Sequence, residues 1–202
     1  MTAVPGKIEL DWLRQRFARA MPATATLYGD QGTRPGADQL HAASVLVPIV
    51  DRAPEPTVLF TQRTAHLKNH SGQISFPGGR AEASDASAEL TALRETWEEV
   101  GLAAERIELL GRLSDYHTRT GYRVTPVVGI VRPPFDLSPD ANEVAEVFEV
   151  PLAFLLDARN HQKHTRKFGG EQREFFAIPY ENRYIWGATA GMLVNLHRFL
   201  VS

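Results

Sequence analysis

The chain has 202 residues, of which 43% are hydrophobic and 23% are charged, and its formal net charge is −2. These values are typical of one soluble globular domain, and they exclude a strong overall field that would recruit nucleic acid or an anionic membrane. The sequence has no cysteine, which excludes disulfides, thiolate metal ligands and a cysteine nucleophile.

No apolar run reaches the roughly 18 residues that a transmembrane helix needs, so we expect no membrane span. The N-terminus lacks the basic and then apolar pattern of a signal peptide. The absence of cysteine fits the cytosol, and we therefore expect a cytoplasmic protein.

The first 40 residues are expected to form a helix and a loop that pack on the main domain. Leu10, Leu13 and Phe17 recur at helical spacing within residues 8–20. The segment that follows, to residue 40, contains several glycines and prolines and is interpreted as a loop. Residues 41–202 are then expected to form one domain.

Two strands should open that domain. Residues 42–50 form a continuous apolar run rich in β-branched residues, which predicts a buried strand. Residues 57–63 alternate in character after a turn with two prolines, so the two strands form a hairpin. A short strand at residues 73–76 is followed by Gly78 and Gly79, where the backbone can approach an anion closely.

A helix ending near Val100 follows the two glycines. Ser84, Asp85 or Ser87 can cap its start, and Gly101 can close its end in a left-handed conformation. Its apolar face is predicted at the i, i+3, i+7 and i+10 positions of Leu90, Leu93, Trp97 and Val100.

Three carboxylates share one face of this helix, because Glu95, Glu98 and Glu99 are spaced i, i+3 and i+4. Like charges at this spacing repel one another, and Arg94 alone cannot neutralise three. A hard divalent cation such as Mg²⁺ or Mn²⁺ can, since it prefers oxygen ligands. The alternative is a solvated acidic face, which most charge runs are.

The remaining chain is predicted to be strand-rich. Strands are expected at residues 107–116, 122–131, 173–180 and 184–186, and Pro126 suggests an edge or a bulge in the second of them. A short helix is predicted at residues 152–156 and a longer one from Gly187 to Leu200, whereas residues 160–170 are interpreted as a polar, flexible segment. This order predicts an α+β domain with a mixed sheet between helices.

Residues 79–102 resemble the signature box of the Nudix hydrolase family, G-x5-E-x7-R-E-U-x-E-E-x-G-U, where U is aliphatic. The matching residues are Gly79, Arg94, Glu95, Glu98, Glu99, Gly101 and Leu102. The spacing between Gly79 and Arg94 is one residue longer than in the general box. Asp85 stands near the first Glu of the box, and Thr96 replaces an aliphatic residue.

A second signature lies directly upstream and resembles that of the coenzyme A pyrophosphatase branch, L-L-T-x-R-[SA]-x3-R-x3-G-x3-F-P-G-G. The matching residues are Leu59, Thr61, Arg63, Gly72, Phe76, Pro77, Gly78 and Gly79. Phe60 replaces the second Leu, Thr64 replaces the small residue, and Leu67 or Lys68 stands where the inner Arg is expected.

The resemblance implies a Nudix-type α/β/α sandwich and a Mg²⁺- or Mn²⁺-dependent pyrophosphohydrolase. It implies metal ligands at Glu95, Glu98, Glu99 and the carbonyl of Gly79. Arg94 is then expected to orient a carboxylate. Phosphate contacts are implied at Arg63, Lys68, His70 and Gly78.

The identity of the general base stays open. A Glu from a loop outside the box often serves family members as a further ligand or base. Glu143 is the first candidate here and Glu146 the second, and Glu95 is the alternative within the box.

By resemblance, the substrate is coenzyme A or an acyl-CoA, cleaved to 3′,5′-ADP and the (acyl-)4′-phosphopantetheine. The alternatives are another nucleoside diphosphate derivative, such as ADP-ribose or a dinucleoside polyphosphate, and a non-catalytic Nudix regulator. An isomerase of the isopentenyl diphosphate type is disfavoured because it relies on a cysteine. Family members often form dimers, so a homodimer is an alternative to a monomer.

Overall fold

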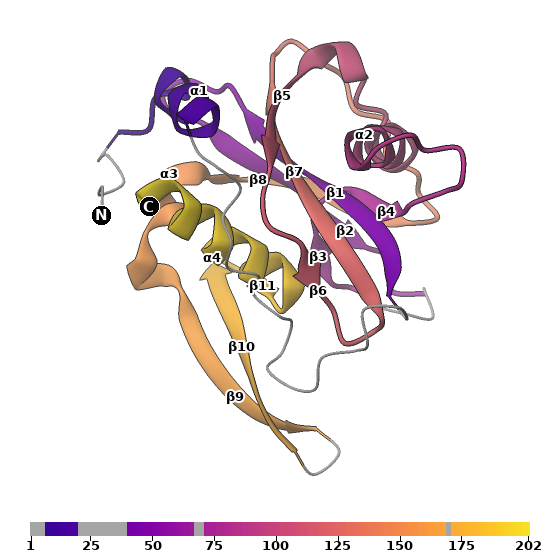
Figure 1. The fold of residues 1–202 in the computed structure, drawn as a ribbon, viewed down its shortest axis with the longest axis vertical. Coiled ribbons are helices and arrows are strands. Elements are labelled where there is room, and N and C mark those ends of the chain that lie inside the picture. The colour runs from indigo at the N-terminus through magenta and orange to yellow at the C-terminus, as the bar shows by residue number, and fades with distance from the viewer. Residues whose placement is uncertain (1–6, 20–39, 67–70, 169–170) are drawn as a thin grey trace.

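The structure is a computed structural model that describes residues 7–19, 40–66, 71–168 and 171–202. It contains one large mixed sheet, a second small sheet and helices on both sides of the large sheet (Figure 1). The α+β class with a mixed sheet is therefore confirmed. The predicted contacts of Lys68 and His70 lie outside the described residues.

The eight-stranded sheet has the order β3-β2-β1-β7-β5. Strands β4, β6 and β8 pair with β1, β7 and β2, respectively. The bounds are β1 His41–Val50, β2 Thr57–Arg63, β3 Ile74–Ser75, β4 Gly78–Arg80, β5 Ile107–Arg112, β6 Tyr116–His117, β7 Tyr122–Val131 and β8 Val144–Pro151. Among the described residues of this sheet, β1 and β7 form a parallel pair and the other pairs are antiparallel.

Strand β1 changes its partner along its length. Its end at Ile49 and Val50 forms the predicted hairpin with β2. Its beginning, from Ala43 to Val45, pairs instead with β4, which carries the two glycines. The two glycines, for which the sequence predicted no strand, therefore belong to a short strand of the sheet.

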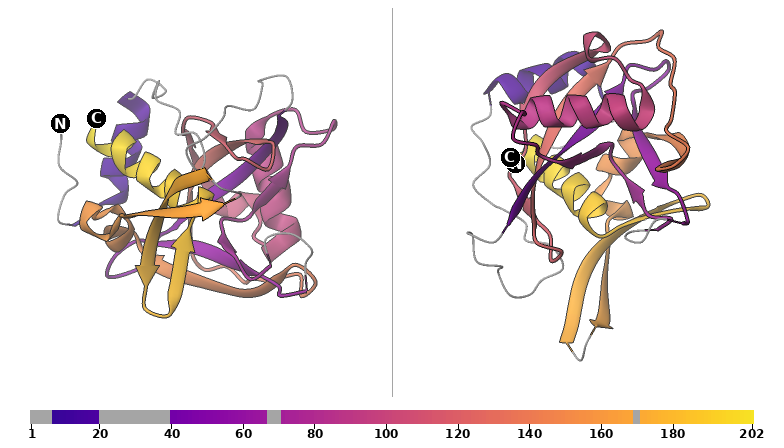
Figure 2. Two further views of the ribbon diagram at one scale, coloured as in Figure 1. Left: turned by 90° about the horizontal axis from the view of Figure 1, so that it is seen from below. Right: turned by 90° about the vertical axis from the view of Figure 1, so that its right-hand side faces the viewer.

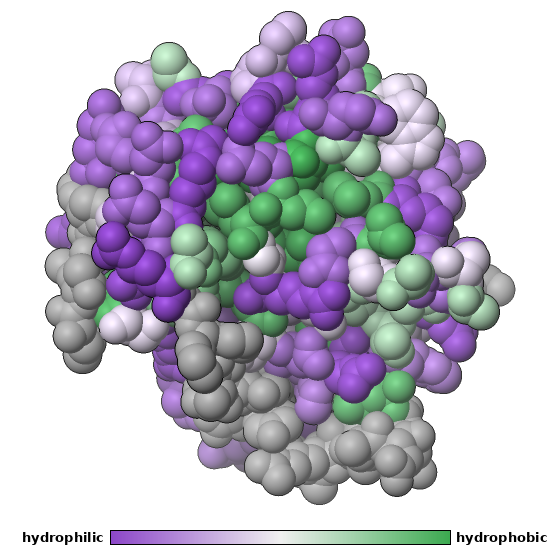
Figure 3. Space-filling model, turned by 45° about the horizontal axis from the view of Figure 1, so that its top comes forward, coloured by the Kyte–Doolittle hydropathy of each residue, from purple (hydrophilic) through white to green (hydrophobic). Residues whose placement is uncertain are grey.

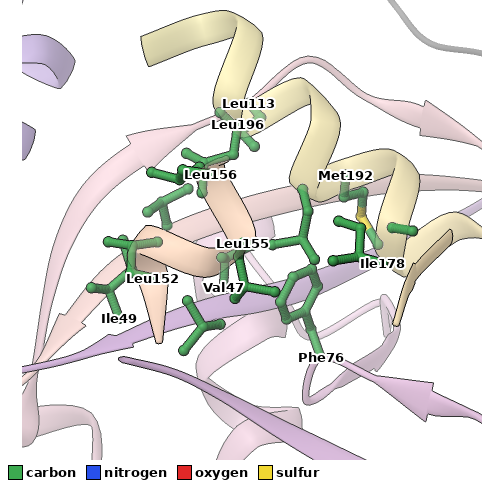
Figure 4. Packing of buried hydrophobic residues seen from close by; sticks show 14 of the residues in the cluster. Val47, Ile49, Phe76, Leu113, Leu152, Leu155, Leu156, Ile178, Met192 and Leu196 are labelled. Carbon is green, nitrogen blue, oxygen red and sulfur yellow. The ribbon is translucent and has the colours of Figure 1, made fainter. Parts of the chain in front are cut away.

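Two helical layers cover the sheet. Helix α2 (Ala88–Val100) lies on one face, where Ala92 packs with Leu46 and Val127. The other face is covered by α1 (Leu10–Arg19), α3 (Leu152–Leu156) and α4 (Ala188–Val201). Their apolar side chains form the main core with residues such as Val47. Figure 4 shows the part of this core to which α3 and α4 contribute.

Helix α1 belongs to this core. Leu13 is fully buried, and the rings of Phe17 and Phe199 lie 4.5 Å apart. Arg14 donates two hydrogen bonds to the carboxylate of Glu108 on β5, at 2.8 and 2.9 Å. Packing and a charged pair therefore hold the first helix against the sheet.

The small sheet contradicts one prediction. Residues 160–170 were expected to be a flexible polar segment, but they follow directly on η3 (Ala158–Asn160) and include strand β9 (Gln162–Phe168). Strand β9 pairs along its length with β10 (Glu171–Tyr180), which pairs in turn with β11 (Arg183–Trp186). The β9–β10 hairpin extends away from the main sheet (Figures 1 and 2). Its lack of an apolar period follows from that exposure.

The interpretation of Pro126 as an edge residue was wrong, because β7 lies inside the sheet. On one side, Pro126 is paired with Val45 of β1. On the other side it faces the break between β5 and β6, where its carbonyl accepts a hydrogen bond from Leu113 N at 2.9 Å. The missing N–H of proline thus falls where the neighbouring strand is interrupted.

Candidate metal and phosphate site

Helix α2 begins and ends where its capping residues predict. Ser87 is the N-cap, and its side chain accepts a hydrogen bond from Leu90 N at 3.3 Å. Gly101 has a left-handed φ of 68°, and its N–H donates to Trp97 O at 2.9 Å. Local chemistry therefore fixes the helix that carries the candidate carboxylates.

The predicted apolar face of this helix was largely wrong. Leu90 is 49% exposed and Trp97 is 58% exposed, although Val100 is buried as expected. The buried face consists of Thr91, Ala92, Thr96, Glu99 and Val100. Figure 3 shows the exposed apolar surface between α1 and α2. The smaller side chains lie against the sheet because they permit a closer approach of the helix.

Arg94 is fully engaged within the protein. Its Nε and Nη2 donate to the two carboxylate oxygens of Asp85, at 3.1 and 2.9 Å, and Nη2 also donates to Arg80 O at 3.1 Å. Its Nη1 donates to Glu95 and Glu98, each at 2.9 Å. A guanidinium has five N–H donors, and all five are used. Arg94 therefore orients carboxylates, as expected, and has no donor left for a ligand.

Asp85 is the anchor of this arrangement. Besides Arg94, its carboxylate accepts hydrogen bonds from Thr91 Oγ1 at 3.0 Å and from Glu82 N at 2.9 Å. The Arg94 guanidinium, with the backbone N–H of Glu82, holds the pKa of Asp85 well below its ordinary value. Asp85 thus ties the loop before α2 to the helix, which the sequence did not reveal.

Glu95 explains why position 79 is a glycine. A Cβ on Gly79 would lie 2.5 Å from Cδ of Glu95, so the carboxylate occupies the space that a side chain would fill. Burial raises the pKa of Glu95, although its pairing with Arg94 opposes the shift. The glycine therefore places a partly desolvated carboxylate directly over strand β4.

Glu99 is the most buried charged side chain of the site, with 5% of its surface exposed. One oxygen, Oε2, accepts a hydrogen bond from Gly78 N at 3.2 Å, and the other, Oε1, lies 3.7 Å from Nη1 of Arg63. Burial raises the pKa of Glu99 to about 7, and the charges of Glu143 and Glu95 add to the rise. Three carboxylates therefore lie close enough to repel one another.

Gly78, which donates this hydrogen bond to Glu99, can only be a glycine. Its φ is 153°, and an added Cβ would lie 2.5 Å from Cα of Val45 on β1. Without a side chain, the strand lies close to β1 and its N–H points at Glu99.

Glu143 reaches the site from the loop before β8. That loop is fixed to the end of α2, because Ser138 N and Asp140 N donate to the carbonyls of Val100 and Glu99, at 2.8 and 3.0 Å. It is also fixed to the end of β2, where Thr64 N donates to Glu143 O at 2.9 Å. The loop contacts thus bring Glu143 toward Glu99 and Glu95.

Glu146 does not belong to this cluster. Its carboxylate is bound by the guanidinium of Arg183 at the start of β11, with one contact at 2.6 Å. The same guanidinium lies 4.4 Å from the centre of the Phe148 ring. Glu146 therefore joins the two sheets through Arg183, and Glu143 is the candidate base outside the box whose loop lies beside Glu99.

The carboxylates of α2 are the ligand type that a hard divalent cation prefers, although two of them are bound to Arg94 in this structure. Among the residues that the structure describes, no three acidic or histidine side chains converge as a ready-made metal site. Glu95 and Glu98 both turn toward Arg94, and Glu99 turns toward Gly78 and Arg63. Carboxylate oxygens, mutual repulsion and burial nevertheless favour a cation near Glu95 and Glu99.

Comparison with known proteins identifies the family. The family model of the NUDIX domain matches residues 40–169. The chain is 44% identical over 155 residues to "Uncharacterized Nudix hydrolase NudL" of Escherichia coli strain K12, covering 76% of this chain and 80% of that protein. The protein of the same name from Yersinia enterocolitica is 41% identical over 156 residues, with coverages of 77% and 80%. The chain therefore belongs to the Nudix family, and it is a hydrolase of the pyrophosphatase type.

Two solved structures are similar to this chain at low identity. A Nudix hydrolase from M. smegmatis, RenU, has a TM-score of 0.49 and 23% identity, covering 64% of this chain and 81% of that chain. A C. elegans Ap4A hydrolase has a TM-score of 0.48 and 20% identity, with coverages of 55% and 80%.

In the part of the chain that the structure describes, no helix is long and apolar enough to cross a membrane.

Proposed function

We propose that this Nudix hydrolase cleaves the diphosphate of coenzyme A or an acyl-CoA. The products are 3′,5′-ADP and the (acyl-)4′-phosphopantetheine. The observation that carries the proposal is the meeting of the two signatures at one place: Arg63 and Gly78 from the upstream signature contact Glu99 of the box helix.

The proposed cofactor is Mg²⁺ or Mn²⁺, held by Glu95, Glu98, Glu99 and the carbonyl of Gly79. When bound, such an ion neutralises phosphate oxygens and lowers the pKa of a coordinated water. Hydrolysis of a diphosphate depends mainly on this neutralisation and on alignment of the water.

The chain's own residues supply the proton acceptor and the positioning. In the proposed step, the water oxygen forms a bond to one phosphorus, the bridging P–O bond breaks, and the water's proton passes to a carboxylate. Glu143 is the better placed base, because its carboxylate accepts no hydrogen bond from the residues that the structure describes, whereas Glu95 is held by Arg94. Arg94 keeps Glu95 and Glu98 in place, and Asp85 keeps Arg94 in place.

A different nucleoside diphosphate substrate is the nearest alternative, since the carboxylates would act in the same way on ADP-ribose or a dinucleoside polyphosphate. A binding-only role is disfavoured, because the box carboxylates Glu95, Glu98 and Glu99 are all present.

The test is product analysis on coenzyme A, ADP-ribose and a dinucleoside tetraphosphate, each with Mn²⁺, with Mg²⁺ and with EDTA. We expect 3′,5′-ADP to form chiefly from coenzyme A and only with a metal. Preference for another substrate would refute the coenzyme A assignment, and turnover in EDTA would refute the metal dependence.

Substitution of single glutamates distinguishes the proposed metal ligands from other acidic residues on the surface. Glu98→Gln and Glu99→Gln should each lower turnover by roughly a hundredfold or more, because each removes a charged ligand. The matched control is Glu105→Gln, an exposed residue of η2 (Ala104–Arg106), which should leave turnover unchanged. Near-normal turnover in both site variants would refute the hypothesis that the carboxylates of α2 bind the catalytic metal.

A further inference from the structure

The two arginines of the site differ in how they are held. Arg94 uses all five of its donors within the protein. The Arg63 guanidinium, by contrast, donates no hydrogen bond to any residue among those that the structure describes, and its side chain is 26% exposed. Its closest acidic contact is Glu99 Oε1, 3.7 Å from Nη1, which is an ion pair beyond hydrogen-bond distance.

Arg63 is nevertheless fixed at its backbone. Its N–H donates to Gln73 O at 2.9 Å, at the junction of β2 with the strand that leads to Gly78. Thr64, the next residue, is bound through its N–H to Glu143 O and through its hydroxyl to Asn142 O, both at 2.9 Å. The backbone is thus held on both sides, whereas the guanidinium is held by no hydrogen bond from the residues that the structure describes.

The two oxygens of Glu99 are also unequal. Oε2 accepts a hydrogen bond from the N–H of Gly78, whereas Oε1 is the oxygen that lies 3.7 Å from the Arg63 guanidinium. A cation on Glu99 would use Oε1, and it would then stand where the positive charge of Arg63 is now nearest. Two positive charges cannot share one carboxylate oxygen in a site this buried without strong repulsion.

We propose that Arg63 is the replaceable counter-charge of Glu99. It neutralises Glu99 before metal binds and is released toward the substrate's diphosphate when Mg²⁺ or Mn²⁺ takes Oε1. This inference rests on the proposed function, because it uses the same metal ligand and the same class of substrate. With Arg63 in this role, metal binding and diphosphate binding favour each other, because each favours the movement of the Arg63 guanidinium away from Glu99 and toward the diphosphate.

Loss of a counter-charge differs in its effect from loss of an ordinary substrate-binding arginine. Removing the Arg63 charge should tighten metal binding and weaken anion binding in the same variant. A purely structural role for Arg63 would weaken both, and a role confined to phosphate binding would leave metal binding in the absence of anion unchanged.

The experiment compares wild type, Arg63→Met and Arg63→Gln. Mn²⁺ binding without nucleotide is measured by electron paramagnetic resonance of free Mn²⁺. The expected result is a Kd lower by about three- to tenfold in both variants, where tenfold corresponds to about 1.4 kcal/mol. Binding of methylenediphosphonate, a diphosphate analogue whose bridge cannot be hydrolysed, to the Mn²⁺-loaded protein is measured by calorimetry and should weaken by at least about tenfold, as for loss of a charge-assisted contact to phosphate.

Arg159→Met is the matched control. Arg159 is 89% exposed at its side chain and pairs with Asp157, so its loss changes the net charge equally without touching the site. Its Mn²⁺ and methylenediphosphonate affinities should equal those of the wild type. Thermal unfolding of each variant establishes that it is folded.

An unchanged or weaker Mn²⁺ affinity in folded Arg63→Met and Arg63→Gln would overturn the inference and leave the proposed function standing. A wild type that binds no Mn²⁺ would overturn the metal dependence itself. Tighter Mn²⁺ binding in the variants would support the inference even if coenzyme A proved to be a poor substrate.

Discussion

Replacing Glu99 by glutamine should stabilise the metal-free protein at pH 8 and change its stability little at pH 5. The carboxyl is 5% exposed, and burial raises its pKa from the ordinary 4.5 to about 7. A glutamine can keep the hydrogen bond from Gly78 N through its carbonyl oxygen and carries no charge at any pH. The variant therefore removes mainly the cost of a buried negative charge.

The sign follows from proton binding. Between pH 4.5 and about 7 the folded protein keeps a proton on Glu99 that the unfolded chain has lost, so stability falls as pH rises through this range. The rise from 4.5 to about 7, at about 1.4 kcal/mol per pH unit, sets an upper limit of about 3 kcal/mol for the penalty above pH 7. For a chain of this size that corresponds to a Tm gain of roughly 6 to 12 °C at most.

The assay is thermal unfolding of the EDTA-treated wild type and Glu99→Gln at pH 5 and at pH 8. Glu105→Gln serves as the control, because this exposed carboxyl should give no difference at either pH. The same Tm difference between wild type and Glu99→Gln at both pH values would refute the account of a buried charge. A lower Tm of the variant at pH 8 would show that Glu99 stabilises the fold as an ion.

Two further substitutions test how the box helix is placed. Gly79→Ala should leave the fold intact but lower turnover by roughly a hundredfold, because its Cβ would displace the Glu95 carboxylate; turnover within about threefold of wild type would contradict the packing. Trp97→Ala should cost less than about 1 kcal/mol in chemical denaturation, since the ring is 58% exposed, whereas Leu46→Ala, fully buried beneath α2, should cost about 2–5 kcal/mol. A larger loss of stability in Trp97→Ala than in Leu46→Ala would show that the apolar face predicted from the sequence is the buried one.

Local signals predicted much of the fold. The β1–β2 hairpin follows from an apolar run, a turn and an alternating run, and all three lie where the sequence places them. The limits of α2 follow from Ser87 and Gly101, whose capping roles depend on neighbouring backbone groups alone. Such features need no knowledge of distant residues, and the sequence sufficed for them.

The face of α2 could not be predicted in the same way. Leu90 and Trp97 mark one apolar arc, and Ala92 and Thr96 mark another on the same helix. Hydrophobicity favours the larger residues, but the choice depends on how closely the sheet must approach, which is a property of the partner strands. Strand β9 escaped prediction for a related reason, since its hydrogen-bond partner is β10 and its exposed side chains carry no period.

The site residues also fall into those that local spacing predicts and those that contacts between distant segments place. Spacing alone grouped Glu95, Glu98 and Glu99, because residues three and four apart share a helix face. The engagement of Arg94 by Asp85 and the approach of Glu143 depend on loop contacts between separate segments. No local pattern carries those contacts, and the sequence left the role of Asp85 and the choice between Glu143 and Glu146 open.

The small residues on the inner face of α2 are therefore part of the site's chemistry. Ala92 is fully buried against the sheet, and Thr96, also fully buried, satisfies its hydroxyl through Ala92 O at 2.6 Å. A helix resting on larger side chains would stand farther from β4, beyond the reach of the Gly78 N–H for Glu99. Close packing holds Glu99 out of water, and in our proposal the resulting cost of its charge is offset by a divalent cation, or by Arg63 in its absence.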